Sequence, residues 1–158
     1  MPRTTPWLWF DTEAEDAASF YVALFPNSSI THVQRYQEAG PRPAGTVMTV
    51  EFDLDGQTYV GLNGGPEHRF TEAVSFMIDC ADQAEVDHYW DAFARGGEPG
   101  PCGWIKDRWG LSWQVVPRAL IELLNDPDPR VAEAVMGAML QMSKIDVAEL
   151  ERARDAAA

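Results

Sequence analysis

Hydrophobic and polar positions follow two periods along the chain, and each period is typical of one kind of secondary structure. A short apolar run at 7–10 is followed by apolar residues at helical spacing up to Phe25, which predicts a strand and then a helix. Further stretches of strand character lie at 29–36, 46–54 and 57–63. Asp55-Gly56 is typical of a two-residue hairpin between the last two. The first part of the chain therefore predicts a βαβββ module over about 6–63.

The same order of elements then occurs again. A strand-like run at 74–80 precedes a helical stripe that ends at Gly96-Gly97. Short strands are expected at 98–101, 102–106 and 111–117. Both helices are expected to begin at capping boxes, which are Thr12 with Glu15 and Asp82 with Glu85. A second module over about 74–117 follows, and because one module alone leaves a half-covered sheet, the two modules are expected to pair in a single domain of α+β class.

The remainder of the chain has helical spacing only. Short helices are expected at 119–124, after the cap and proline at Asp128-Pro129, and from Asp146 onward. These helices make a C-terminal helical extension over about 118–154.

Charge and composition exclude several classes of partner. The chain has 25 acidic and 12 basic residues and a formal net charge of −13, which disfavours nucleic acid and anionic membrane surfaces. No apolar run approaches the roughly 20 residues of a membrane helix, and the first residues lack an apolar signal core. Cys80 and Cys102 have no CxxC spacing and are expected to be reduced. Together these features predict a cytoplasmic protein.

Strand alternation separates an apolar face, expected under the helices, from a more polar one. The polar face is predicted to hold Glu51, Asn63, Ser75 and Gln114, with Met77 on the same side as Ser75. Such a face is either simply solvated or lines a cleft for a small ligand. Both interpretations stay open on alternation alone.

Several motifs in order along the chain resemble the PhnB-like family, whose domain carries the label 3-demethylubiquinone-9 3-methyltransferase. The matching stretches are 10–15 leading to Phe20-Tyr21, 61–66, 73–76, 102–107, 110–117 and 139–142. This family belongs to the vicinal oxygen chelate superfamily of glyoxalases, bleomycin-resistance proteins and extradiol dioxygenases. The resemblance implies eight strands in a curled mixed sheet with a cleft, and homodimers in which modules can be exchanged between chains.

The resemblance also indicates where metal-using relatives hold a divalent ion, with His and Glu side chains from four strands. The aligned positions fall near Pro6 or Trp7, near Gly61 or Leu62, at Ser75 and at Gln114. None of them is a His, Asp, Glu or Cys, so the chain is expected to bind no metal and no other cofactor. The methyltransferase label is also not supported, because no glycine-rich turn joins a strand to a helix.

Three functions are compatible with these features. The first is a small-molecule binding protein in which Trp7, Trp9 and Trp104 stack on the ligand, and Asn63, Ser75 and Gln114 orient its polar groups. The second is an enzyme acting on a small carbonyl or phenolic compound, with Glu51 as candidate base, which would have to be buried to hold a proton near neutral pH. The third is a structural dimer with an incidental cleft. The expected partners are a small molecule and a second copy of the chain.

Overall fold

The computed structural model describes residues 4–158. The chain forms two compact units, one that ends at Phe70 and a second that comprises Thr71–Ala158. Each unit contains one of the two modules that the hydrophobic pattern predicts.

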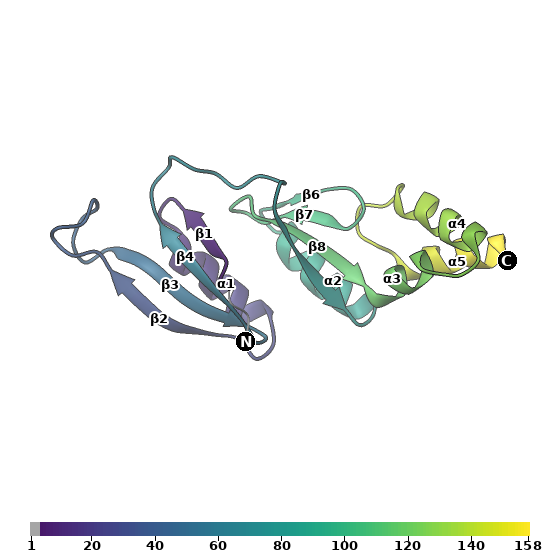
Figure 1. Ribbon diagram of the computed structural model, residues 1–158, viewed down its shortest axis with the longest axis horizontal. Helices are drawn as coiled ribbons and strands as arrows, with labels where there is room; N and C mark the ends of the chain where they lie inside the picture. The colour runs from purple at the N-terminus through teal and green to yellow at the C-terminus, as the bar shows by residue number, and fades with distance from the viewer. Residues whose placement is uncertain (1–3) are drawn as a thin grey trace. The chain divides into compact units, whose positions relative to one another are not determined.

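Unit 1 has the predicted order of elements. They are β1 (Trp7–Phe10), α1 (Ala14–Leu24), β2 (Ser29–Arg35), β3 (Val47–Leu54) and β4 (Gln57–Asn63). The strands form a mixed sheet in the order β1-β4-β3-β2, in which β1 is parallel to β4 and the other neighbours are antiparallel (Figure 1). The first module is therefore βαβββ.

Unit 2 repeats this arrangement and adds the helical extension. Its module contains β5 (Ser75–Cys80), α2 (Gln83–Ala94), β6 (Glu98–Pro99), β7 (Trp104–Lys106) and β8 (Ser112–Pro117). The sheet order is β5-β8-β7-β6, with β5 parallel to β8. The extension contains α3 (Arg118–Leu124), α4 (Pro129–Met139) and α5 (Val147–Ala157). An α+β fold of paired βαβββ modules is thus confirmed, with the eight strands divided between two four-stranded mixed sheets.

Helix α1 covers one face of the first sheet. Tyr21 of the helix packs on Phe52 of β3, and the Phe52 ring stacks on Tyr59 of β4 with 5.6 Å between ring centroids. A Cβ atom placed on Gly61 of β4 would lie 3.1 Å from the Cβ of Ala14. The glycine therefore allows α1 to lie close to β4.

Helix α2 covers the corresponding face of the second sheet. The Trp113 ring of β8 stacks on Phe93 of α2 at 5.0 Å and contacts Phe76 of β5 at 5.7 Å between ring centroids. Ile105 of β7 is paired with Trp113 and is buried. These apolar side chains lie on the face that alternation predicts for this sheet.

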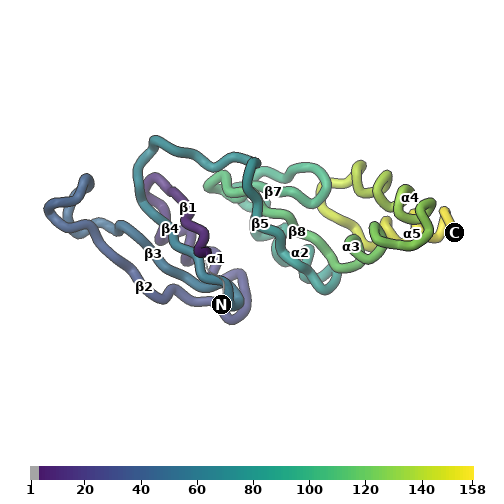
Figure 2. Tube along the Cα trace, in the orientation of Figure 1, coloured from purple at the N-terminus to yellow at the C-terminus, as the bar shows by residue number. Residues whose placement is uncertain are grey.

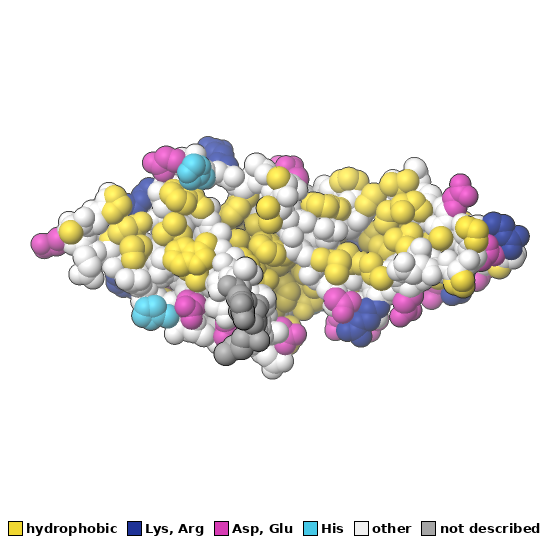
Figure 3. All heavy atoms as spheres, in the orientation of Figure 1, with side chains coloured by type: hydrophobic (Ala, Val, Ile, Leu, Met, Phe, Trp, Pro, Cys, Tyr) yellow, Lys and Arg dark blue, Asp and Glu magenta, His cyan; other side chains and the backbone are white. Residues whose placement is uncertain are grey.

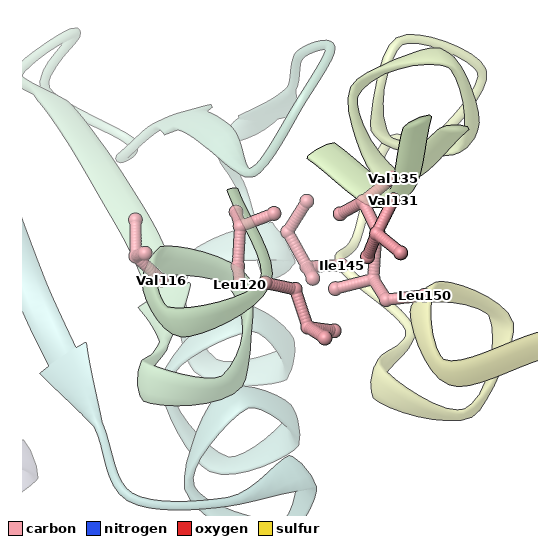
Figure 4. Packing of buried hydrophobic residues seen from close by; sticks show 7 residues of the cluster. Val116, Leu120, Val131, Val135, Ile145 and Leu150 are labelled. Carbon is pink, nitrogen blue, oxygen red and sulfur yellow. The ribbon is translucent and has the colours of Figure 1, made fainter. Parts of the chain in front are cut away.

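The extension has its own apolar core, which connects it to β8. The buried side chains that form this core are Val116, Leu120, Leu123, Val131, Val135, Ile145 and Leu150 (Figure 4). Because Val116 belongs to β8 and the others to the extension or the segment before α5, the core attaches the extension to module two.

The starts of α2, α4 and α5 agree with the sequence, whereas that of α1 differs. The Asp82 carboxylate accepts the N–H of Glu85 at 3.0 Å, as predicted for α2. For α1 the prediction was wrong, because the N-cap is Glu13 and no side chain of that residue caps the helix. The first helical N–H, that of Ala14, instead donates to the Asn63 side chain at 2.8 Å. The cap of α1 thus comes from β4, which lies far away in the sequence.

Both cysteines are free thiols, in agreement with the sequence. Burial raises the pKa of the Cys80 thiol to about 12. Across residues 4–158, no helix is both long enough and apolar enough to cross a bilayer. Hydrophobic side chains are visible at the surface of both units (Figure 3). Trp7, Met77 and Leu140 are among the large hydrophobic residues that are exposed.

Candidate functional site

The helix-free face of the first sheet holds three of the predicted site residues. Trp7 and Trp9 of β1 are paired in register with Val60 and Leu62 of β4, on the side opposite α1. Trp7 is 60% exposed. Trp9 is held more firmly, since its indole N–H donates to the Gly65 carbonyl at 2.9 Å and its ring makes an edge contact with His68.

Glu51, the candidate base, also lies on this helix-free face. It occupies β3 between the helix-facing residues Val50 and Phe52 and is exposed. Its carboxylate accepts a hydrogen bond from the Thr31 hydroxyl at 3.1 Å. Within unit 1 the side chain therefore lacks the burial that the hypothesis of a catalytic base requires.

Asn63 does not share that face, and its placement corrects the predicted alternation of β4. Its Oδ1 accepts the Ala14 N–H at the start of α1, its Nδ2 donates to the Val47 carbonyl at 3.1 Å, and the residue is buried. The alternation was misread because Gly61 and Asn63, on the helix side of β4, are small or polar, whereas Val60 and Leu62 on the other side are apolar. The Asn63 amide is thus used to hold the fold of unit 1.

The helix-free face of the second sheet brings four predicted residues together. Met77, Gln114 and Trp104 lie in register across β5, β8 and β7. Gln114 donates from Nε2 to the Ser75 hydroxyl at 2.9 Å. Gln114 therefore projects on the side opposite Trp113, as alternation predicts, and forms a neutral polar pair with Ser75.

A pocket of about 400 Å³ lies in unit 2 beside these residues. This volume falls within the range of about 300–1,000 Å³ typical of small-molecule sites. Its apolar lining includes Pro99, Pro101, Cys102, Trp104 and Ile105, and its polar lining includes Glu72, Glu98, Lys106 and Ser112. Of the predicted site residues only Trp104 lines it.

Ser112 lines the pocket and carries a polar group that has no partner among the described residues. It is 1% exposed, and its hydroxyl has no hydrogen-bond partner within residues 4–158. An unsatisfied buried hydroxyl costs about 1–3 kcal/mol of folding free energy. A ligand that bonds to this hydroxyl would recover that energy.

The pocket also has a charged group of side chains, here named the charged triad, which consists of Lys106, Glu72 and Glu98. The Lys106 ammonium makes a short contact with the Glu72 carboxylate and lies 3.8 Å from that of Glu98. The hydrogen bond from Lys106 lowers the pKa of Glu72, and the same bond raises the pKa of Lys106. Both groups therefore stay charged at neutral pH.

The segment that follows α4 and leads into α5, residues 142–147, is here named the returning segment (Figure 2). It holds one wall of the pocket. The carbonyl of Met142 accepts the Cys102 N–H at 2.9 Å, and that of Ser143 accepts the Gly103 N–H at 2.8 Å. The Ser143 hydroxyl donates to the Gly100 carbonyl at 2.6 Å. Loop 100–103 is thereby bonded along its length to the returning segment.

The returning segment is itself anchored on α2. The Gln83 amide donates to the Ile145 carbonyl at 3.0 Å and accepts the Val147 N–H at 2.8 Å. Lys144 forms an ion pair with Asp91 at 2.8 Å. The pocket wall is therefore connected through the returning segment to the helix that covers the other face of the sheet.

The sequence could have indicated part of this pocket. Ser112 and Lys106 are polar residues on the same side as Gln114 and Trp104, so alternation alone could have placed them on the helix-free face. The wall could not be predicted, because the pairing of loop 100–103 with the returning segment has no local sequence pattern.

The residues on these faces do not fit the metal site that the superfamily resemblance implies. Gln114 and Ser75 bond to each other, Gly61 has no side chain, and Trp7 offers no ligand atom suited to a divalent ion. Among the described residues no three His, Cys, Asp or Glu side chains gather closely enough to hold an ion.

We therefore predict that the purified protein binds no stoichiometric zinc, nickel, manganese or iron. Elemental analysis after dialysis checks this expectation. One tightly held ion per chain would contradict it and would show that the strands are aligned incorrectly with those of metal-using relatives.

Each unit is a βαβββ module whose sheet has one helix-free face, and this fold defines the class of the protein. The chain belongs to the family described as 3-demethylubiquinone-9 3-methyltransferase, whose sequence model matches residues 2–116. The match ends in β8, so α3, α4 and α5 lie outside it.

Two solved structures are each similar to about three quarters of this chain. A Bacillus cereus PhnB protein, described as a 3-demethylubiquinone-9 3-methyltransferase, is 32% identical and has a TM-score of 0.65 over 73% of this chain and 99% of its own. A Pseudomonas aeruginosa protein is 18% identical, with a TM-score of 0.62 over 74% of this chain and 98% of its own. A search of curated proteins found no match.

Proposed function

We propose that this chain is a metal-free small-molecule binding protein whose ligand occupies the pocket of unit 2. The observation that carries the proposal is Ser112, which lines an otherwise largely apolar pocket and whose buried hydroxyl has no hydrogen-bond partner among residues 4–158. An apolar cavity with a few polar groups is the usual composition of a site for a small organic ligand. Trp104 supplies stacking area, and Ser112 orients the ligand.

The enzyme hypothesis has weaker support. Its candidate base, Glu51, is exposed in unit 1 and already bonded to Thr31. The methyltransferase description belongs to the family and to the Bacillus cereus relative. In unit 1 the glycines at 61, 64 and 65 lie in β4 and the loop after it, not in a turn between a strand and a helix. Methyl transfer of the usual nucleotide-cradling type has no structural support here.

We also propose that the protein is a cytoplasmic homodimer. Exposed apolar side chains on the two helix-free faces, Trp7 and Met77, support a surface that a second copy covers. The acidic composition and the free cysteines support an intracellular location.

The proposed function predicts opposite effects of Ser112→Ala on stability and on binding. Removing a buried hydroxyl without a partner should leave the melting temperature of the ligand-free protein unchanged or raise it. For a compound found in a thermal-shift screen, the same change should weaken binding about 2- to 13-fold, because one neutral hydrogen bond contributes roughly 0.5–1.5 kcal/mol. Isothermal titration calorimetry measures this ratio.

Ser19→Ala is the matched control, since Ser19 is exposed on α1 and lies outside the pocket. Ser19→Ala should change neither the melting temperature nor the binding affinity. A screen of a few hundred neutral, cationic and anionic compounds without any stabilising hit would contradict the proposal, as would equal affinity of the wild type and Ser112→Ala for every hit.

A further inference from the structure

The charged triad gives the pocket an excess of one negative charge. Two carboxylates, those of Glu72 and Glu98, surround the single ammonium of Lys106. Glu72 holds the ammonium closely, whereas the Glu98 carboxylate is 3.8 Å away and its side chain is 78% exposed. Glu98 is therefore the carboxylate that is most available to a second cation.

The register of the strands places an apolar surface next to this charge. Glu98 is paired with Lys106, and Lys106 with Ser112, so the three residues form one row across β6, β7 and β8. Trp104 lies on the same side of β7, two residues before Lys106, and lines the same pocket. A ligand in the pocket therefore lies against a carboxylate, an indole ring and Ser112, whose buried hydroxyl has no partner among the described residues.

From this arrangement we propose that the pocket selects compounds that carry a protonated amine on a small aromatic body. This inference rests on the proposed function and adds the chemical class of the ligand. The amine pairs with Glu98, the body packs on Trp104, whose ring also favours a nearby cation, and a polar atom of the ligand bonds to Ser112.

The charges of the pocket disfavour anionic ligands and neutral ligands relative to cationic ones. An anionic ligand would need to displace a carboxylate from Lys106, which both triad carboxylates already neutralise. It would also approach a protein with a formal net charge of −13. A neutral ligand would use Trp104 and Ser112 but would gain nothing from Glu98.

The wall of the pocket is ordered before a ligand arrives. Loop 100–103 contains two consecutive residues with left-handed backbone, Cys102 at φ 57° and Gly103 at φ 83°. The hydrogen bonds to Met142 and Ser143 hold them in this conformation. Because less freedom is lost on binding to an ordered wall, even a small ligand can bind measurably.

Three probes that share an indole ring and differ in charge test the inference. They are tryptamine, 3-methylindole and indole-3-acetate, titrated into the full-length protein by calorimetry at low salt. Tryptamine should bind most tightly and indole-3-acetate least tightly. The tryptamine affinity should fall as salt is added, since salt screens an exposed charge pair.

Two substitutions should move the tryptamine affinity in opposite directions. Glu98→Gln should weaken the binding of tryptamine about 2- to 5-fold. This is the range expected for an exposed ion pair that contributes up to roughly 1 kcal/mol. Lys106→Gln removes the competing ammonium and should strengthen tryptamine binding. Binding of 3-methylindole should change less than about 2-fold in both variants, because it carries no charge to pair with Glu98.

Glu122→Gln is the matched control, because it makes the same change of charge on α3, outside the pocket. Equal effects of Glu98→Gln and Glu122→Gln would overturn the inference, as would weaker tryptamine binding in Lys106→Gln. Tryptamine that binds no more tightly than the other two probes, or not at all at millimolar concentration, would overturn it too. None of these results decides the proposed function, which the compound screen and Ser112→Ala test separately.

Discussion

Asp107→Ala is expected to destabilise the protein by about 3–5 kcal/mol, the largest effect that we predict for a single substitution. The Asp107 carboxylate is buried. One oxygen accepts the backbone N–H groups of Trp109 and Leu111, and the other accepts the indole N–H of Trp113, each at 3.0 Å. Alanine would remove the carboxylate from all three donors, of which the Leu111 N–H and the Trp113 indole N–H are buried and the Trp109 N–H is partly buried.

Denaturation with urea measures this loss. Asp107→Asn keeps one acceptor oxygen but presents an amide NH2 group to a neighbouring donor, so its effect should be smaller, roughly 2–3 kcal/mol. Asp16→Ala, at an exposed position of α1, should stay within about 0.5 kcal/mol of the wild type. A change below about 1 kcal/mol for Asp107→Ala would show that these hydrogen bonds contribute little.

Asn63→Ala is expected to destabilise unit 1 by about 2–4 kcal/mol. The change removes the cap of α1, which typically contributes about 0.5–2 kcal/mol, and leaves the Val47 carbonyl without the Asn63 amide. The loss of stability is again measured by urea denaturation.

Asn63→Asp separates the two contributions. Aspartate keeps an oxygen for the Ala14 N–H and adds a negative charge at the start of the helix, but it cannot donate to Val47. It should therefore be less destabilising than alanine. If both variants lose equal stability, the cap is not the main role of Asn63.

The roles of Asn63 and Asp107 explain why the sequence predicted the fold better than the site. The strand and helix periods depend on burial, which repeats along the chain, and these periods identified both modules. The side of Asn63 was misassigned because a polar residue can be buried when a helix N-terminus uses its oxygen. The helix N-terminus belongs to a different element from Asn63, so the sequence around Asn63 carries no pattern that reveals the contact.

In the second sheet, alternation assigned the predicted residues to the correct face. Alternation placed Ser75, Met77 and Gln114 together on the helix-free face, and the structure places them there because Trp113 occupies the helix side. The lack of a partner for Ser112 could not be predicted, since it depends on the positions of all its neighbours. The pocket wall depends likewise on a long-range pairing with the returning segment.

The returning segment also has a consequence for the order of events during synthesis. A ribosome adds roughly 5–20 residues per second, and domains generally fold from the N-terminus as they emerge. Cys102 and Gly103 are made several seconds before Met142 and Ser143, which accept their N–H groups. Until the extension is made, loop 100–103 therefore lacks the two hydrogen bonds that Met142 and Ser143 supply to its left-handed residues. Translation that stops after β8 would release a chain whose sheet is complete in sequence but whose pocket lacks the segment that holds one of its walls.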